Sequence, residues 1–333
     1  MTPLDTACAP ANTVEAPDDV DNVLPTAADW LDAGESVVLV TLVGIDGSSP
    51  RPLGAQMAVT GSGQACGFIS NGCLEREIID RAHRVLARGE NECVRYGKGS
   101  PYIDIVLPCG SGLDLYFDQS MDPALIRQAR DRLQQRQPVA IETDLDRGHS
   151  RLTTVGGSSP SDVSRSDGRT FVRHYPPALR LLLCGEGPAL RACARLAHTS
   201  GFEVQVHTPE AASLAALARD GLPVIRMRHR GDPVELKTDA WTAAVVLFHD
   251  HDGEPELLAR LLDSPVFYIG AQGSQRTHAS RVEALRLAGF DDRDIVRIHG
   301  PMGLIPRSKN PTTLAVSTLA EVLHHAQQRG YPC

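Results

Sequence analysis

The stretch 179–206, LRLLLCGEGPALRACARLAHTSGFEVQV, decides the fold of the carboxy-terminal half of the chain. It begins with an apolar strand at Leu179–Cys184, and the turn GEGP leads into a helix that ends before Gly201. A second strand follows at Glu203–Val206. A strand, a helix and a strand joined by short connections form a βαβ unit, in which a nucleotide phosphate rests on the helix N-terminus. We therefore predict a parallel sheet covered by helices.

The turn of this βαβ unit matches a dinucleotide-binding fingerprint only in part. Gly185 and Gly187 supply the first two glycines of G-x-G-x-x-G, but Leu190 stands in place of the third. The acidic residue expected about 20 positions further on, which would bind a ribose, is replaced by His207, and Glu210 is a late candidate. The pattern therefore supports the fold more strongly than it supports NAD(P) binding.

Strands and helices continue to alternate after this unit. We expect strands at 223–227, 243–248, 266–269 and 295–298, and helices at 255–262, 278–288 and 311–328. In a parallel sheet, the residues just beyond the carboxyl ends of the strands line one ligand-binding crevice. The candidates at this edge are Gly185, Gly187, Gly270, Gly273, Ser274, Arg276 and His299. The sequence HDHD at 249–252 lies there too and could ligate a metal or move a proton. A solvated loop is the favoured interpretation, because adjacent residues seldom point at one centre.

Two loops of the amino-terminal half combine glycine with side chains suited to an oxyanion. The loop 44–54, GIDGSSPRPLG, offers the hydroxyls of Ser48 and Ser49 and the guanidinium of Arg51. A second loop, at 108–112, joins alternating apolar runs that predict two strands. It contains Cys109, Gly110 and Ser111, and its glycines would let backbone amides form an anion-binding nest beside the thiol.

Cys73 is the second cysteine with unusual surroundings. It follows Asn71 and Gly72 and precedes a helical stretch at 74–89, so its thiol is expected at a helix N-terminus, where a thiolate is favoured. Filling space as a small buried residue is the alternative for both Cys73 and Cys109. The chain has eight cysteines and no CxxC pair, which excludes the common zinc-finger and zinc-ribbon patterns.

The amino-acid composition indicates the broad class of protein. With 333 residues, 42% of them hydrophobic and 22% charged, the chain is typical of a two-domain globular protein. No apolar run approaches the roughly 20 residues of a membrane span, and a net charge of −8 without a basic block argues against nucleic-acid or membrane partners. The start of the chain lacks signal-peptide features, so we expect a cytoplasmic protein.

The expected domain organisation follows from these patterns. Residues 1–24 are interpreted as a disordered lead-in, 25–145 as an α+β domain with a mixed sheet, 146–177 as a Gly/Ser-rich linker, and 178–333 as a Rossmann-like, doubly wound parallel sheet. Further elements of the first domain are expected as helices at 27–33 and 123–135 and strands at 37–43, 56–60, 65–69, 92–96 and 138–143. The fold class is thus α/β.

Six segments in this order resemble a known family. GSSPRPLGAQMAV, GFISNGCLEREI and LPCGSGLDLYF are similar to the amino-terminal domain of the xanthine dehydrogenase accessory proteins, the XdhC/CoxI family. FHDHDGEPELL, YIGAQGSQRTHASRVEALRLAGF and RIHGPMGL with PTTLAVSTLAEVL are similar to that family's Rossmann domain. The chain departs from the family at Ser111, where a glycine is frequent, and at 305–308, where IPRS replaces DIGA.

The resemblance implies a molybdenum-cofactor chaperone without turnover of its own. Such a protein holds the molybdopterin while a cysteine desulfurase adds the sulfido ligand, then passes it to an apo-molybdenum hydroxylase of the xanthine dehydrogenase or aldehyde oxidase type. The resemblance also implies a homodimer. The implied binding residues are Ser48, Ser49, Arg51, Asn71, Gly72, Cys73, Cys109, Gly110 and Ser111, with Cys73 or Cys109 approaching Mo. The Rossmann edge residues Gly185, Gly187, Gly270, Gly273, Ser274 and Arg276 are further cofactor-binding candidates that follow from the expected sheet topology.

Two other functions fit parts of the sequence. A NAD(P)-dependent oxidoreductase would use the Rossmann half and take its substrate contacts from the first domain, but the fingerprint is incomplete at Leu190. A zinc or iron regulator would use the cysteines and the HDHD segment, whose spacing is unfavourable.

Overall fold

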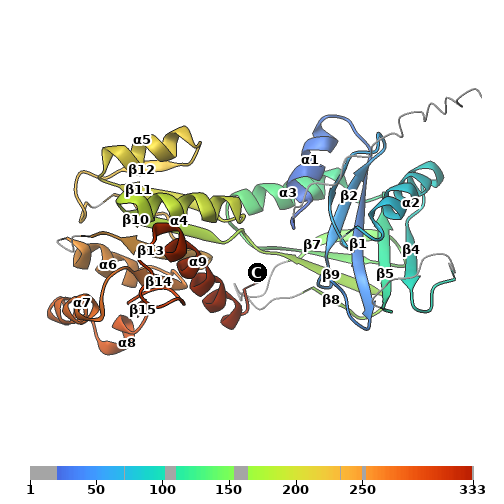
Figure 1. Ribbon diagram of the computed structural model, residues 1–333. Coiled ribbons are helices and arrows are strands. Elements are labelled where there is room, and N and C mark those ends of the chain that lie inside the picture. The colour runs from blue at the N-terminus through green and yellow to red at the C-terminus, as the bar shows by residue number, and fades with distance from the viewer. Residues whose placement is uncertain are drawn as a thin grey trace, which may run out of the picture. The chain divides into compact units, whose positions relative to one another are not determined.

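A computed structural model describes residues 21–70, 72–101, 110–153, 164–232, 234–249 and 253–331 (Figure 1). The described residues divide into two compact units: 21–176 form the amino-terminal unit and 177–331 the carboxy-terminal unit, with the gaps just given. Residues 1–20 of the expected lead-in (1–24), and the strand expected just before the loop 108–112, lie outside the described residues. The end of the expected lead-in is ordered, because Val23 and Leu24 are buried and Leu24 begins a helix. None of the described helices has the length and apolarity needed to cross a bilayer.

The first sheet of the amino-terminal unit has the order β3-β2-β1-β5-β4. Its strands are β1 (Val37–Asp46), β2 (Gln56–Thr60), β3 (Ala65–Gly67), β4 (Glu92–Gly97) and β5 (Gly112–Asp118). Every neighbouring pair is antiparallel, so this is not the mixed sheet that we expected. The reason is that the connections 47–55 and 61–64, which join β1, β2 and β3, are shorter than the crossover that a parallel pair requires.

The second sheet of this unit has the order β7-β6-β9-β8 and is also antiparallel. It consists of β6 (Val139–Asp144), β7 (His149–Thr153), β8 (Arg165–Ser166) and β9 (Thr170–Tyr175). Three of these strands fall in 146–177, where we expected a linker. Phe171, Val172 and Tyr175 are buried and hold β9 in the unit, but the Gly, Ser and Asp residues around them obscured this pattern.

Three helices cover the two faces of the first sheet: α1 (Leu24–Asp32), α2 (Glu75–Arg88) and α3 (Pro123–Gln134). Val38, Val40 and Leu42 of β1 pack in one core with α2, whereas Leu39 packs with α1 and α3 in another. Because successive strand residues point to opposite faces, a strand covered on both sides needs a continuous apolar run. This explains the sequence VVLVTLV in β1.

The carboxy-terminal unit is a six-stranded sheet with the order β12-β11-β10-β13-β14-β15. The strands are β10 (Arg180–Gly185), β11 (Glu203–Thr208), β12 (Val224–Arg226), β13 (Thr242–Leu247), β14 (Tyr268–Ala271) and β15 (Ile298–His299). All pairs are parallel, and the order reverses between β10 and β13. This confirms the Rossmann-like sheet and places its expected ligand crevice at the ends of β10 and β13.

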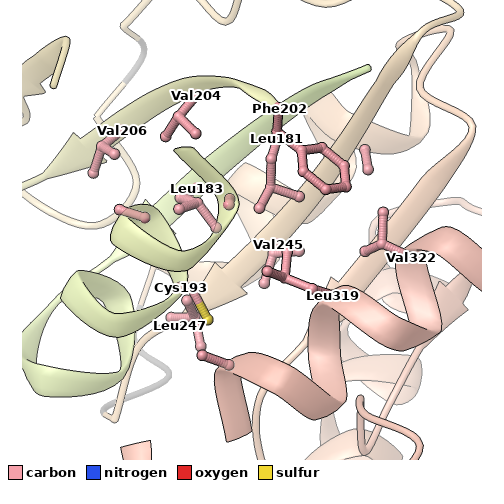
Figure 2. Packing of buried hydrophobic residues seen from close by; sticks show 14 of the residues in the cluster. Leu181, Leu183, Cys193, Phe202, Val204, Val206, Val245, Leu247, Leu319 and Val322 are labelled. Atoms are coloured by element: carbon pink, nitrogen blue, oxygen red, sulfur yellow. The ribbon is translucent and has the colours of Figure 1, made fainter. Parts of the chain in front are cut away.

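Helices cover both faces of this sheet. They are α4 (Gly187–Thr199), α5 (Ala211–Arg219), α6 (Glu254–Leu262), α7 (Gln275–Leu287), α8 (Asp292–Ile295) and α9 (Pro311–Gln328). Figure 2 shows Leu181, Leu183, Val245 and Leu247 of the sheet packed against Cys193 of α4 and Leu319 and Val322 of α9. The intervening residues Leu182, Ala244 and Val246 form the other core with α6 and α7. The helices α5 and α8 were not anticipated.

Candidate functional site

Two predicted site residues of the amino-terminal unit meet although they lie 63 positions apart in sequence. The amide of Ser48 donates a 3.1 Å hydrogen bond to Oγ of Ser111, and the two hydroxyl oxygens are 3.3 Å apart. Ser48 lies in the loop after β1, and Ser111 directly precedes β5, which pairs with β1. Gly47 has φ +96°, and a Cβ there would lie 3.1 Å from Oγ of Ser111. Glycine thus allows this close approach.

Arg51 joins the same loop to the loop after β3. Its guanidinium lies over the ring of Phe68, 4.2 Å from the centroid, and forms an ion pair with the exposed Asp21. Its amide donates a 3.3 Å hydrogen bond to Oγ of Ser49. The buried Nε of Arg51 has no hydrogen-bond partner among the described residues. Arg51 is therefore a cation held in a defined position, and a guanidinium is a side chain that pairs well with an oxyanion.

The loop that bears Cys73 is shaped by a buried carboxylate, that of Glu75. One oxygen of Glu75 accepts hydrogen bonds from the amides of Ile69 (3.0 Å) and Ser70 (2.7 Å), and the other accepts from the hydroxyl of Ser70 and the amide of Gly72, both at 2.7 Å. Burial by itself would raise the pKa of Glu75, but the hydrogen bonds from Ser70 and Ile69 hold it below the usual value. The carboxylate therefore stays ionised and fixes the loop.

Cys73 is exposed and lies two residues before the first residue of α2. The neighbouring amides of Ser70, Gly72 and Leu74 donate to Glu75, so they are not available to a bound anion, contrary to the sequence-based interpretation. The thiol is exposed, and the described residues Ser70 and Gly72 near it are hydrogen-bonded to Glu75. Gly72 has φ +100°, and a Cβ at this position would have no atom within 4 Å. Glycine is therefore favoured here by the backbone conformation of the turn and not by lack of space.

Other predicted residues of this site are only partly described. Asn71 and Cys109 lie outside the described residues. Gly110 has φ +68° and is exposed, as expected for a turn residue that leaves room beside it. The described structure thus brings together Ser48 and Ser111, and separately links Ser49, Arg51 and Phe68.

In the carboxy-terminal unit, the N-terminus of α4 already holds an anionic group. The amide of Gly187, which has φ +79°, donates a 2.8 Å hydrogen bond to Oε2 of Glu210. The same oxygen accepts from Ser213 and pairs with Arg191 at 3.3 Å. The hydrogen bonds from Ser213 and Gly187 lower the pKa of Glu210. A carboxylate therefore occupies the place where a dinucleotide phosphate would rest.

The other predicted residues at this edge have roles within the fold. A Cβ on Gly185 would lie 2.6 Å from the carbonyl oxygen of Leu247, and one on Gly270 would lie 2.7 Å from the phenol oxygen of Tyr268. A Cβ on Gly273 would lie 3.0 Å from Thr277. Ser274 caps α7 by accepting a 3.1 Å hydrogen bond from the amide of Thr277. Arg276 is exposed on α7, and the segment 250–252 lies outside the described residues.

Comparison with known proteins assigns the family. The chain is 33% identical over 305 residues to the molybdenum cofactor insertion chaperone PaoD of Escherichia coli, covering 92% of this chain and 88% of that protein. The XdhC and CoxI family model matches residues 30–97, and the XdhC Rossmann domain model matches residues 181–322. The chain belongs to the XdhC/CoxI family.

Two further proteins resemble this XdhC/CoxI chain along most of its length. A probable xanthine dehydrogenase subunit of Bacillus subtilis is 25% identical over 318 residues, covering 88% of this chain and 94% of that protein. A solved structure from Bacillus halodurans, described as a xanthine dehydrogenase, matches with a TM-score of 0.72 and 19% identity and covers 92% of this chain and 96% of that one. The solved structure supports the fold.

Four charged groups of this XdhC/CoxI protein have structural roles that the sequence analysis missed. Glu75 follows the S-N-G-C turn within the segment CLERE, where an acidic residue at the start of a helix is a capping signal. The sequence suggested Glu210 only as a ribose ligand. Arg281 and Glu254 form a buried ion pair at 2.7 Å between α7 and α6, and helical periodicity alone gives no sign of it.

Proposed function

We propose that this protein is a molybdenum-cofactor-binding chaperone that does not turn over a substrate. The observation that supports this most strongly is its 33% identity, over nearly the whole chain, to a molybdenum cofactor insertion chaperone. The paired strands that bring Ser48 to Ser111 add a physical argument, since they gather the motif segments at one end of a sheet.

The chemistry of the cofactor suits the residues around this sheet. Molybdopterin carries a phosphate, for which the guanidinium of Arg51 and the hydroxyls of Ser48 and Ser49 are appropriate donors. Its dithiolene-bound molybdenum accepts soft ligands, and the exposed thiol of Cys73 could approach it. Cys109 and Asn71 belong to the proposed site on the resemblance to the family.

We further propose that the protein holds the cofactor during sulfuration by a cysteine desulfurase. It would then deliver it to an apo-molybdenum hydroxylase of the xanthine dehydrogenase or aldehyde oxidase type. A homodimer is part of this proposal and rests on the family resemblance, and a cytoplasmic location stays a prediction from the sequence.

The proposal is tested by cofactor content. The full chain is produced in a host that makes molybdopterin and is purified without air, and released pterin and Mo are assayed. We expect near-stoichiometric pterin in the wild type and a severalfold loss in Arg51→Ala and in Cys73→Ser or Cys109→Ser. Cys93→Ser is the matched control, because Cys93 is also exposed in the amino-terminal unit but lies on β4 outside the motif segments.

Two outcomes would contradict the proposal. Equal pterin content in the Cys73, Cys109 and Cys93 variants would remove the thiol assignment. Pterin-free wild-type protein that binds NAD(P)H in a saturable manner would favour an oxidoreductase instead.

A further inference from the structure

A group of side chains that can ligate a metal lies in the carboxy-terminal unit, where the end of β15 meets α9. His299 is the last residue of β15, and Glu321 and His325 are four residues apart on α9, so they project from one face of that helix. One ligand atom from each residue can be chosen so that all three atoms lie within 4.8 Å of one another. The ring centroids of His299 and His325 are 4.1 Å apart.

The carboxylate of Glu321 is oriented by neighbours that leave one of its oxygens available. Its Oε2 accepts a 2.9 Å hydrogen bond from the phenol of Tyr268 and another from the amide of Gly303. Oε1 has no hydrogen-bond partner among the described residues. The phenol of Tyr268 is the donor in this contact and restrains the orientation of the carboxylate.

The imidazole of His299 is held in a defined plane. It stacks on the ring of Tyr268 with an interplanar angle of 6° and a centroid distance of 4.8 Å. Gly270 makes this arrangement possible, because a Cβ there would collide with Tyr268. No described residue forms a hydrogen bond to the ring nitrogens of His299 or His325.

We propose that His299, Glu321 and His325 bind one divalent first-row transition metal ion, such as Zn²⁺ or Fe²⁺. Two imidazoles and one carboxylate are a donor set that Zn²⁺ and Fe²⁺ accept, and such sites leave open positions for water or another ligand. Bonds of about 2.0–2.2 Å place neighbouring ligand atoms roughly 3–4 Å apart, so binding draws the three side chains slightly together. Tyr268 then holds two of the ligands in place, Glu321 by a hydrogen bond and His299 by stacking.

This site goes beyond the proposed cofactor chaperoning. All three ligands belong to the carboxy-terminal unit, whereas the residues with which we propose to bind the phosphate and molybdenum belong to the amino-terminal unit. The sequence analysis placed only His299 at the crevice edge, because the spacing of 22 residues to Glu321 matches no short metal-binding motif.

The test is a metal titration of the full chain after chelator treatment. Co²⁺ is the spectroscopic probe, Zn²⁺ is the competitor, and the bound metal is counted by elemental analysis. We expect one ion per chain in the wild type, visible Co²⁺ absorption bands without thiolate charge transfer, and displacement by Zn²⁺. Affinity should fall at least about tenfold in Glu321→Gln and in His325→Ala, since even loss of an outer-shell partner has effects of that size.

Two controls separate this site from surface binding and from misfolding. His198→Ala removes an exposed histidine at the end of α4 and should leave the affinity unchanged. Metal-free Glu321→Gln should keep the wild-type circular dichroism spectrum, because the amide oxygen can still accept a hydrogen bond from Tyr268. Zn²⁺ should raise the melting temperature of the wild type but not that of Glu321→Gln. Substoichiometric binding, equal affinity in wild type and variants, or a cobalt–thiolate spectrum would each overturn the proposal. Pterin content is measured independently of these results.

Discussion

The carboxylate of Glu210 accepts a 2.8 Å hydrogen bond from the amide of Gly187, at the first turn of α4. In a Rossmann fold this amide faces the phosphate of the nucleotide. Here the chain supplies its own anion, and Arg191 and Ser213 hold that anion in place. The incomplete glycine fingerprint and the occupied helix terminus therefore agree, since both disfavour a dinucleotide at this edge.

A direct consequence concerns nicotinamide cofactors. The wild-type chain is expected to show no saturable binding of NADH or NADPH in a fluorescence titration, because Glu210 repels a second anion at α4. Tight binding of either nucleotide would show that Glu210 moves away or that the cofactor uses another surface.

Glu210→Ala should destabilise the carboxy-terminal unit by about 1 kcal/mol at neutral pH, which is typical of losing a helix N-cap interaction. Since the folded pKa of Glu210 lies below its usual value of 4.5, its contribution is present above about pH 4.5 and is lost as the pH falls through the folded pKa. Urea unfolding at pH 7 and below pH 4 measures both effects. An undiminished difference at low pH would argue against the charged carboxylate as the cause.

Glu75→Gln should cost about 2 kcal/mol or more at neutral pH, because a glutamine presents an NH₂ group to donors that now face a carboxylate. The folded pKa of Glu75 is lowered, so this stabilisation is present above about pH 4.5 and declines on acidification. We also expect reduced pterin retention, since the loop that positions Cys73 would lose its fixed shape. Glu90→Gln, at an exposed position after α2, is the control and should change neither quantity.

Leu319→Ala and Leu323→Ala compare two positions of the same helix. Leu319 lies in the core between α9 and the sheet (Figure 2) and is 5% exposed. Leu323 is 36% exposed. We expect a loss of about 2–5 kcal/mol for Leu319→Ala from the lost burial and the cavity, and less than about 1 kcal/mol for Leu323→Ala. Denaturant unfolding of both variants checks the difference, and similar losses would mean that α9 packs differently.

Gly270→Ala distinguishes packing from ligand binding at a residue that the sequence assigned to a cofactor. A Cβ would lie 2.7 Å from the phenol oxygen of Tyr268, so we expect about 1–3 kcal/mol of destabilisation and weaker Co²⁺ binding at His299 and Glu321. Gly61→Ala is the control, because its nearest neighbour would be 3.8 Å away. Wild-type stability in Gly270→Ala would favour a ligand-binding role for this glycine.

Local sequence patterns predicted much of the fold. The strands β10, β11 and β13 were expected from apolar runs, and α9 has the expected bounds, Pro311–Gln328. The strand β9 was missed because Arg173 and His174 interrupt the alternation between Val172 and Tyr175. Partial burial of Arg173 and His174 depends on the other strands of the second sheet, which the sequence of one strand does not specify.

The candidate site was less predictable, because its contacts join distant segments. The Ser48–Ser111 contact requires the register of β1 against β5, which is set by pairing and not by either motif. Likewise Arg51 and Phe68, or His299 and Glu321, become neighbours only once the sheets and helices have assembled. Residue types pointed to suitable chemistry, but the sequence did not show which groups are already satisfied within the chain.

The buried carboxylate of Glu75 also bears on how cargo would exchange. Because the amides of Ile69, Ser70 and Gly72 are bonded to it, the Cys73 loop has its final shape before any ligand arrives. A loop that is ordered in advance loses little conformational entropy when a ligand binds, and it need not refold when the ligand leaves. For a carrier, the rate of hand-over would then be governed by the bonds to the cargo itself, and a client protein could compete for that cargo without first remodelling the loop.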